Sequence, residues 1–199
     1  MKQIALPLAT GTDSSPLRIV VGNSNSAAVD ALSDPSTWPF RTAILFGPPR
    51  SGKTSLARWF CASDHGDVID DADIIEEDIV FHRWNRAQES GKPLLLVSSA
   101  KGGNWQIDLP DLKSRLGAAL QLSIGSPDDA MLAKLIVVHA EMRGVVLDDS
   151  ATDYLVPRCE RSHIGVEKLV AAIDRLSLER KQPPTLAIWR DALAETPGN

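Results

Sequence analysis

The stretch AILFGPPRSGKT, residues 43–54, decides the fold of this chain. Its opening residues AILF form a short apolar run of the kind found in buried parallel strands. Residues 47–54 then match G-x-x-x-x-G-K-S/T, the pattern of a phosphate-binding P-loop. Residues 55–62 continue with the composition and spacing of an amphipathic helix. Pattern and context agree, which disfavours the alternative of a Gly/Pro turn that matches by chance.

Such a loop predicts that the chain binds a nucleotide. Its glycines let the backbone wrap closely around phosphates, and the amino end of the following helix adds a favourable dipole. We expect Lys53 to reach the outer phosphates and Thr54 to hold Mg²⁺. The predicted ligand is therefore ADP or ATP with Mg²⁺. The predicted phosphate-binding residues are Gly47, Pro48, Pro49, Arg50, Ser51, Gly52, Lys53 and Thr54.

The composition predicts a soluble globular protein. The chain has 199 residues, 43% of them hydrophobic and 24% charged, which is enough for one or two compact units. A net charge of −5 argues against a broad nucleic-acid-binding surface, which is normally basic. No run resembles a membrane span or a signal peptide, and Cys61 and Cys159 are expected as buried thiols, so a cytoplasmic location is predicted. The four histidines show no metal-ligand spacing with the cysteines, and no zinc is expected.

A second candidate motif is the acidic run DVIDDAD at residues 67–73. A strand of the Walker B type ends in an Asp that holds Mg²⁺ through water, which favours Asp70, and Asp71 would orient the attacking water. A solvated acidic turn is the alternative, since only two apolar residues lead into the acids. Only 16 residues separate Lys53 from Asp70, so the strand–helix unit usual between these motifs is predicted to be shortened or missing.

The remaining pattern predicts an α/β fold, a parallel sheet flanked by helices, followed by a small all-helical lid. We expect a flexible tail at 1–16, a nucleotide-binding base domain at 17–125 and the lid at 126–199. Further strands are expected at 17–21, 94–97 and 119–124, and Ser99 after the second of these would lie near the γ-phosphate. The expected helices span residues 26–32, 55–62, 74–90, 109–116, 126–143, 147–157, 166–181 and 186–194.

Residues 3–8, QIALPL, form a candidate docking peptide ahead of a small, polar, turn-rich tether. Pro7 biases Leu6 towards an extended backbone. Leu6 and Leu8 would then serve as anchors, and Gln3 would offer its amide at the head. An edge strand or an ordinary frayed end explains these residues equally well on chemistry alone.

These residues resemble the DnaA-related AAA+ proteins, and most closely the Hda regulators, along almost the whole chain. VVGNSN at 20–25 looks like the segment ahead of the initiator's core. VIDDAD at 68–73, with FHRWN at 81–85, looks like the Walker B strand and the helix that follows it. LPDLKSRL at 109–116 is similar to the box that carries the family's arginine finger, which falls on Arg115.

The resemblance implies regulatory inactivation of the initiator DnaA. Hda proteins carry a clamp-binding motif that residues 3–8 resemble. They bind ADP, dock on the DNA-loaded β sliding clamp of DNA polymerase III, and drive DnaA to hydrolyse its ATP. Arg115 would enter the initiator's active site in trans and stabilise charge on the transferring phosphoryl group, whereas the alternative is a surface salt bridge. The nucleotide bound to this chain would be structural, with Val21 and Gly22 lining the adenine pocket.

Some positions depart from the family's pattern. Ser99 stands where an acid or amide often serves as sensor 1. The sensor 2 arginine expected near Ile164 is missing, and we do not assign its role to the nearby Arg158 or Arg161. The chain ends at Asn199 without a helix-turn-helix domain, so no sequence-specific DNA binding is expected. These departures suit a nucleotide holder whose own ATPase activity is weak or absent.

Other functions compete with this one. The chain could be a self-contained ATPase that loads or remodels a replication partner, which requires Asp70 and Asp71 in working geometry. It could be a non-catalytic adaptor that only binds the clamp, for which Arg115 would not matter. A small-molecule kinase shares the P-loop pattern but gives the helical lid and the apolar tail no purpose. The resting nucleotide and the oligomeric state, including an isologous homodimer, stay open.

Overall fold

The structure is a computed structural model that describes residues 19–100 and 105–197. Those residues divide into two compact units. The base unit holds Ile19 and Asn25–Gly125, and the helical unit holds Val20–Ser24 together with residues 126–197.

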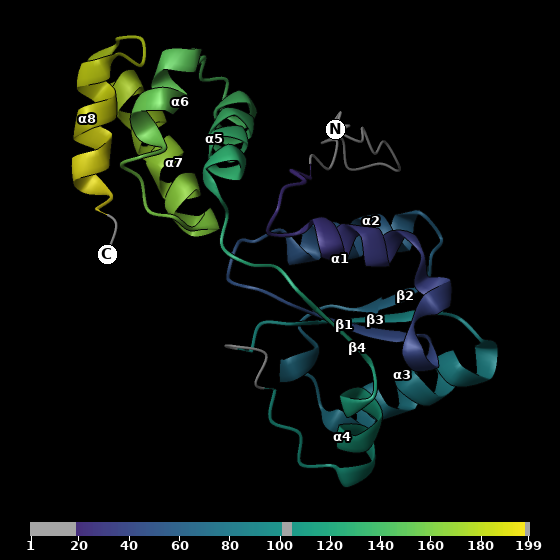
Figure 1. The fold of residues 1–199 in the computed structure, drawn as a ribbon. Coiled ribbons are helices and arrows are strands. Elements are labelled where there is room, and N and C mark those ends of the chain that lie inside the picture. Colours follow the sequence, from purple (N-terminus) through teal and green to yellow (C-terminus); the bar gives the residue numbers. More distant parts are fainter. Residues whose placement is uncertain (1–18, 101–104, 198–199) are drawn as a thin grey trace. The chain divides into compact units, whose positions relative to one another are not determined.

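The base unit is built on a sheet whose four described strands are all parallel (Figure 1). Parallel sheets are covered on both faces by their connecting helices, so their central strands are apolar throughout. The two central strands, β1 and β3, are accordingly buried at every residue. In the spatial order β2-β3-β1-β4, the strands are β1 (Thr42–Phe46), β2 (Asp67–Ile69), β3 (Leu94–Ser98) and β4 (Leu120–Ser123).

Helices cover both faces of this sheet, which makes the base unit a three-layer α/β/α structure (Figure 1). Successive strand residues point to opposite faces. Ile44 of β1 and Leu96 of β3 accordingly pack in one cluster with Trp84 and Leu112 of the lower helical layer. The predicted fold class is confirmed. One face carries α1 (Ser26–Ser33) and α2 (Lys53–Ala62), and the other carries α3 (Glu77–Ser90) and α4 (Pro110–Gly117).

The connection from α2 to β2 is a short turn. α2 ends at Ala62 and β2 begins at Asp67, which leaves no room for another strand and helix. The Asp67 N–H donates to the Pro93 carbonyl at 2.8 Å, so β2 pairs directly with β3. The strand–helix unit that the spacing predicted to be missing is therefore not present.

Four expectations from the sequence differ from the structure. Residues 19–22 form no strand. The helix expected at 74–90 is interrupted: a 3₁₀ turn, η3 (Ala72–Ile74), precedes α3, because Ile75 takes an extended backbone. The apolar spacing also predicts Ile79 on the buried face of that helix, but Ile79 is 48% exposed, since α3 buries Val80, Trp84 and Ala87. Cys61 is also exposed, not buried.

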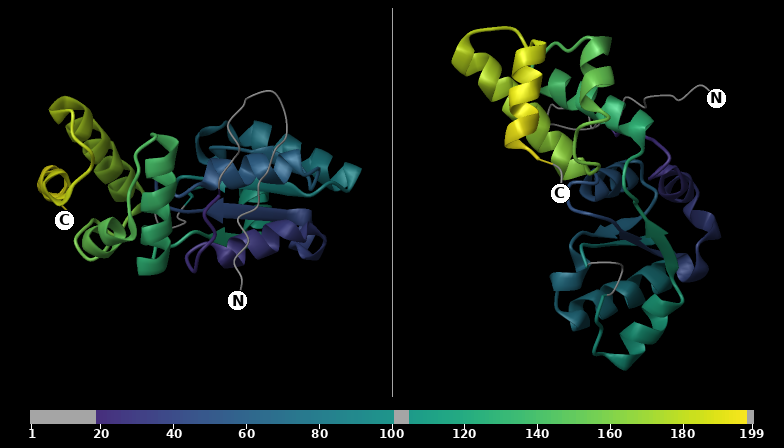
Figure 2. Two further views of the ribbon diagram at one scale, coloured as in Figure 1. Left: turned by 90° about the horizontal axis from the view of Figure 1, so that it is seen from above. Right: turned by 60° about the vertical axis from the view of Figure 1, so that its left-hand side comes forward.

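The helical unit contains α5 (Asp129–Met142), α6 (Asp149–Leu155), α7 (His163–Arg180) and α8 (Leu186–Glu195), shown from two further sides in Figure 2. A side-chain cap starts each of the first three helices. Asp128 accepts from the Met131 N–H, Asp148 from the Ala151 N–H, and Ser162 from the Gly165 N–H. Such caps satisfy amides that have no partner inside the helix. A cluster that includes Leu132, Ile136, Leu155, Leu169, Ile173 and Ile188 forms the core of this unit.

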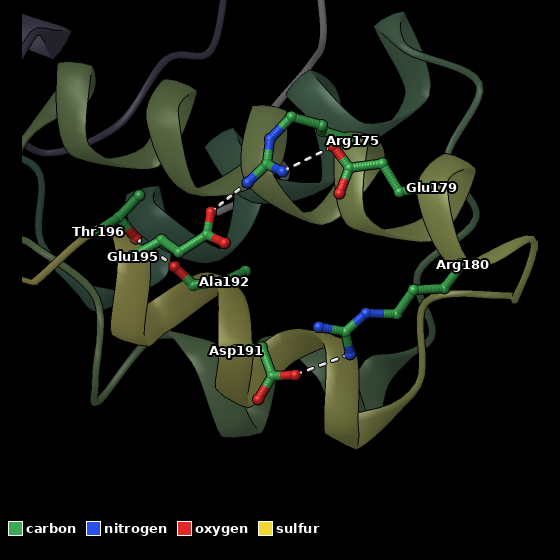
Figure 3. A network of polar contacts seen from close by, with 7 residues as sticks. All are labelled: Arg175, Glu179, Arg180, Asp191, Ala192, Glu195 and Thr196. Atoms are coloured by element: carbon green, nitrogen blue, oxygen red, sulfur yellow. Dashed lines mark hydrogen bonds and ion pairs between the residues drawn. The ribbon is translucent and has the colours of Figure 1, made fainter.

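Ion pairs on the surface join α7 to α8 (Figure 3). Arg175 contacts Glu179 on its own helix and Glu195 on α8, and Arg180 donates to Asp191 at 2.7 Å. Exposed pairs of this kind contribute little stability each. They complement the apolar contacts of Ile188 and hold α8 along α7. Across the part of the chain that the structure describes, no helix has the length and apolar character needed to cross a bilayer.

Candidate nucleotide-binding site

The predicted P-loop connects the carboxyl end of β1 to the amino end of α2. Arg50 and Gly52 take left-handed backbone conformations, with φ of 63° and 89°. Left-handed residues that alternate with right-handed ones build the anion-binding concavities known as nests. At Gly47, a Cβ would lie 2.9 Å from Ser51 Oγ and 3.0 Å from Ile124 Cβ, so a side chain here would force its neighbours to shift. The sequence pattern thus has the local backbone that phosphate binding needs.

Lys53 lies beneath this loop and is 93% buried, with only 7% of its surface exposed. Its ammonium donates to the carbonyl oxygens of Gly47 at 2.8 Å and Pro48 at 3.1 Å. Burial lowers the pKa of Lys53 below its ordinary value, while the carboxylates of Asp71, Asp70 and Asp73 act in the opposite direction. A cation held here against nearby carboxylates is available to an incoming phosphate.

Ser51 and Thr54 offer hydroxyl groups at the same turn. Ser51 Oγ is buried and has no hydrogen-bond partner among the described residues. A buried hydroxyl without a partner is costly, and a phosphate oxygen in the loop would satisfy it. Thr54 is exposed in the first turn of α2, open to a metal ion carried by the phosphates. The residues present therefore fit a nucleotide phosphate group.

The predicted Walker B acids follow β2, at the same edge of the sheet as the P-loop. Asp70 Oδ1 accepts from the Asp71 N–H at 3.1 Å, and Asp71 has a left-handed backbone with φ of 50°. That turn starts η3 and brings Asp73 back towards the strand ends. The carboxyl ends of parallel strands meet at one edge, which is why acids distant from the P-loop in sequence act on the Lys53 charge.

Ser99, the candidate sensor 1 residue, contacts these acids directly. Its N–H donates to Asp73 Oδ1 at 2.9 Å, and its Oγ donates to Asp71 Oδ1 at 3.4 Å. Ser98 is fully buried, and its Oγ accepts from the Ala100 N–H at 3.1 Å. The end of β3 is thus tied to the acids after β2. Sequence reasoning did not single out Asp73, although the i, i+1, i+3 spacing of the acids Asp70, Asp71 and Asp73 after a strand was a signal for it.

Val21 and Gly22, the predicted adenine-pocket residues, group with the helical unit. Gly22 is buried against Met131, whose Sδ would lie 2.9 Å from a Cβ at that position. Ser24 also donates to Met131 Sδ at 2.8 Å. This strap, residues Val20–Ser24, is therefore packed on the first turn of α5.

The two lid arginines near the expected sensor 2 position have partners within the helical unit. Arg161 forms an ion pair with Asp129 at 2.5 Å. Arg158 donates to the Tyr154 carbonyl at 2.9 Å, and its guanidinium lies 4.2 Å from the Tyr154 ring centre. These contacts account for both side chains inside the unit. The predicted clamp-binding residues Gln3, Leu6, Pro7 and Leu8 lie outside the described residues.

Arg115 lies on α4, on the face of the sheet opposite to α2 (Figure 1). Its guanidinium carbon is 4.4 Å from the ring centre of Phe81 and 4.5 Å from that of Trp84. Its Nη1 donates to Asn85 Oδ1. These partners on α3 were not identified from the sequence. Their signal was the spacing of 81, 84 and 85, which puts all three on one side of a helix.

Comparisons with known proteins relate the chain to the AAA+ fold. No family model matches it. An uncharacterized protein of Haemophilus influenzae is 26% identical over 232 positions, which cover 96% of this chain and 98% of that protein. Because the alignment is longer than the 199 residues of this chain, that relative carries residues that this chain lacks.

Solved structures match it more clearly. Domain III of the Thermotoga maritima replication initiation protein DnaA gives a TM-score of 0.73 at 14% identity, over 91% of this chain and 95% of that chain. AMPPCP-bound DnaA from Aquifex aeolicus gives 0.59 at 19% identity, over 82% and 66%. The Holliday junction branch migration motor RuvB of Thermotoga maritima gives 0.56 at 16% identity, over 77% and 61%. The chain therefore has a P-loop AAA+ fold like that of DnaA domain III.

Proposed function

We propose that this chain is a nucleotide-holding AAA+ regulator of replication initiation. It would dock on the DNA-loaded β sliding clamp of DNA polymerase III and stimulate ATP hydrolysis by the initiator DnaA. The likeness in fold to DnaA domain III supports the general class. The step from that class to a regulator depends on Arg115.

One observation carries this step: the P-loop leads into α2 on one face of the sheet, whereas the helix of the finger candidate, α4, lies on the other face. Lys53 begins α2, whereas Arg115 is held by α3 in the opposite layer (Figure 1). An arginine in that layer is remote from the phosphates of its own chain. An arginine finger supplied to another protein's active site explains why a cation is organised there, and such a finger accelerates hydrolysis by about 10³- to 10⁵-fold.

The proposed resident ligand is ADP, or ATP before turnover, with Mg²⁺. The main-chain N–H groups of Arg50, Ser51 and Gly52, together with the Ser51 hydroxyl and the Lys53 ammonium, would bind the phosphates. Thr54 and Asp70 would hold Mg²⁺. The described residues contain no cluster of three or more His, Cys, Asp or Glu side chains suited to a metal.

The test is DnaA-catalysed ATP hydrolysis with the clamp loaded on DNA, with and without this protein. We expect the protein to accelerate hydrolysis strongly and Arg115→Ala to remove about 10³-fold or more of that effect. Lys113→Ala is the matched control, because Lys113 is an exposed cation on the same helix. A variant with both Leu6 and Leu8 changed to Ala should fail to stimulate hydrolysis where stimulation requires the clamp, because these two residues would dock on it.

Unchanged hydrolysis, or full stimulation by Arg115→Ala, would contradict the proposal and favour a clamp-binding adaptor. Equal losses in Arg115→Ala and Lys113→Ala would indicate a general charge effect on the encounter instead of a finger.

A specific observation also favours a second candidate, a self-contained ATPase. Asp71 and Asp73 both contact Ser99, at the same edge as Lys53. These are the groups a hydrolytic site would use. Steady ATP turnover by the isolated protein, lost in Asp71→Asn, would support this candidate. The regulator predicts negligible turnover under the same conditions.

A further inference from the structure

One side of α3 contacts both ends of the segment that carries Arg115. Glu77, Phe81, Trp84 and Asn85 follow each other at spacings of four, three and one residues, so they line one side of this helix. α3 and α4 lie in the same layer of the base unit (Figure 1). The contacts at each end are of different chemical kinds.

Glu77 holds the beginning of the segment. Its Oε1 accepts from the Asp108 N–H at 2.8 Å, and its Oε2 accepts from the Leu109 N–H at 2.6 Å. Leu109 occupies the N-cap position of α4 and has no side chain able to cap the helix. Hydrogen bonds from amides to a carboxylate are among the stronger ones in proteins. Glu77 therefore fixes where α4 begins relative to α3.

Phe81, Trp84 and Asn85 hold the other end. The Arg115 guanidinium lies over both aromatic rings and donates to the Asn85 amide oxygen. A guanidinium attracts the faces of aromatic rings through its charge and also stacks on them. It carries five N–H donors in its plane, and Asn85 takes one. An arginine held through its faces still directs donors outwards from its edge.

We propose that α3 is a template that sets the orientation of Arg115, with Phe81, Trp84 and Asn85 as positioning residues and Glu77 as the anchor of the helix start. The inference rests on the proposed function for its target, a nucleoside triphosphate bound to a partner protein. A free arginine loses considerable rotamer freedom when it binds, and a side chain already oriented loses less. The template therefore raises the maximal rate and leaves docking unchanged.

The orientation can be tested without any partner. In the full-length protein labelled with ¹⁵N-arginine, the Nε–Hε resonance of Arg115 is assigned by its disappearance in Arg115→Lys. We expect ring currents to shift this resonance away from the position of exposed arginines. Phe81→Leu, which keeps an apolar side chain and removes the ring, should reduce the shift, and Phe81→Tyr should retain it. Asn85→Leu should broaden or move the Nε–Hε resonance. Asn85→Asp keeps an acceptor oxygen and should leave the resonance in place.

The same variants are then compared in the partner's hydrolysis reaction as a function of their concentration. We expect Phe81→Leu and Asn85→Leu to lower the maximal rate roughly three- to tenfold, since each removes a single orienting contact. The half-saturating concentration should not change. Phe81→Tyr should restore the rate, and Glu89→Ala, an exposed position on the same helix, is the control. Loss of folded protein would instead change the amount needed for saturation.

The outcomes separate the two proposals. An Arg115 resonance at the position of exposed arginines overturns the template, whatever the hydrolysis data show. A shifted resonance together with full stimulation by Arg115→Lys overturns the proposed function, and the role of the template with it. A shift that is reduced in Phe81→Leu while the maximal rate stays at the level of the parent protein overturns the template alone.

Discussion

Gly66 lies where the chain turns from α2 into β2. A Cβ at this position would lie 2.3 Å from the carbonyl oxygen of Pro93 and 3.0 Å from Cε1 of Phe60. The same carbonyl accepts from the Asp67 N–H, which begins the pairing of β2 with β3. A side chain at position 66 would push these strands apart just ahead of the Walker B candidates.

We expect Gly66→Ala to lower the free energy of unfolding by about 1–3 kcal/mol, because the backbone at Pro93 has to move. Gly117→Ala is the control: a Cβ there meets no atom within 4 Å, and alanine favours the last turn of α4. Urea unfolding followed by circular dichroism measures both variants. A midpoint for Gly66→Ala equal to that of the parent protein would mean that the turn relaxes freely.

At the scale of elements, the start of α7 follows a side-chain cap and not the apolar periodicity. The third lid helix was expected from residue 166, where the apolar pattern starts, but α7 begins at His163. Ser162 is responsible, because its Oγ accepts from the Gly165 N–H at 2.9 Å and donates to Glu160 at 2.5 Å. A hydroxyl at the N-cap accepts a hydrogen bond from an amide of the first turn, which has no partner within the helix.

Ser162→Ala should lower the free energy of unfolding by about 1 kcal/mol, since it removes this cap, and Ser162→Asp should restore most of it. Ser177 on the same helix provides the contrast. Its Oγ is buried without a partner among the described residues, so Ser177→Ala should be neutral or stabilising. Thermal unfolding of the three variants gives the comparison. A larger loss for Ser177→Ala than for Ser162→Ala would contradict this account of the cap.

At the scale of the whole molecule, each unit has a core of its own. Ile173 is fully buried in the helical unit, and Leu95 is fully buried in the central strand β3 of the base unit. The local stability of each unit is governed by the contacts of its own elements.

Ile173→Ala should therefore increase amide hydrogen exchange in α5–α8 and leave the amides of β1 and β3 protected, and Leu95→Ala should do the reverse. Each substitution leaves a cavity and is expected to cost about 2–5 kcal/mol locally. Exchange followed by mass spectrometry resolves the two sets of peptides. Release of the same amides by both substitutions would show that the molecule unfolds as one cooperative unit.

The sequence by itself determined the elements that neighbouring residues specify. The pattern at 47–54 requires a tight turn between a buried strand and a helix, and the structure has both. The 16 residues between Lys53 and Asp70 left no room for a further strand–helix unit. Gly144 marked the end of α5 through a left-handed backbone, whereas the sequence left the cap at its start open between Ser126 and Asp128, and the structure has Asp128 there. These signals are local, so each can be read within a few residues.

Only the tertiary structure decided which distant residues meet. It placed β3 between β2 and β1, tied Ser99 to Asp71 and Asp73, and packed the Val20–Ser24 strap on Met131. It also laid Arg115 on Phe81, Trp84 and Asn85. Periodicity tells which side of a helix is apolar, but not which element covers it. Those contacts depend on how helices and strands far apart in the chain share one core.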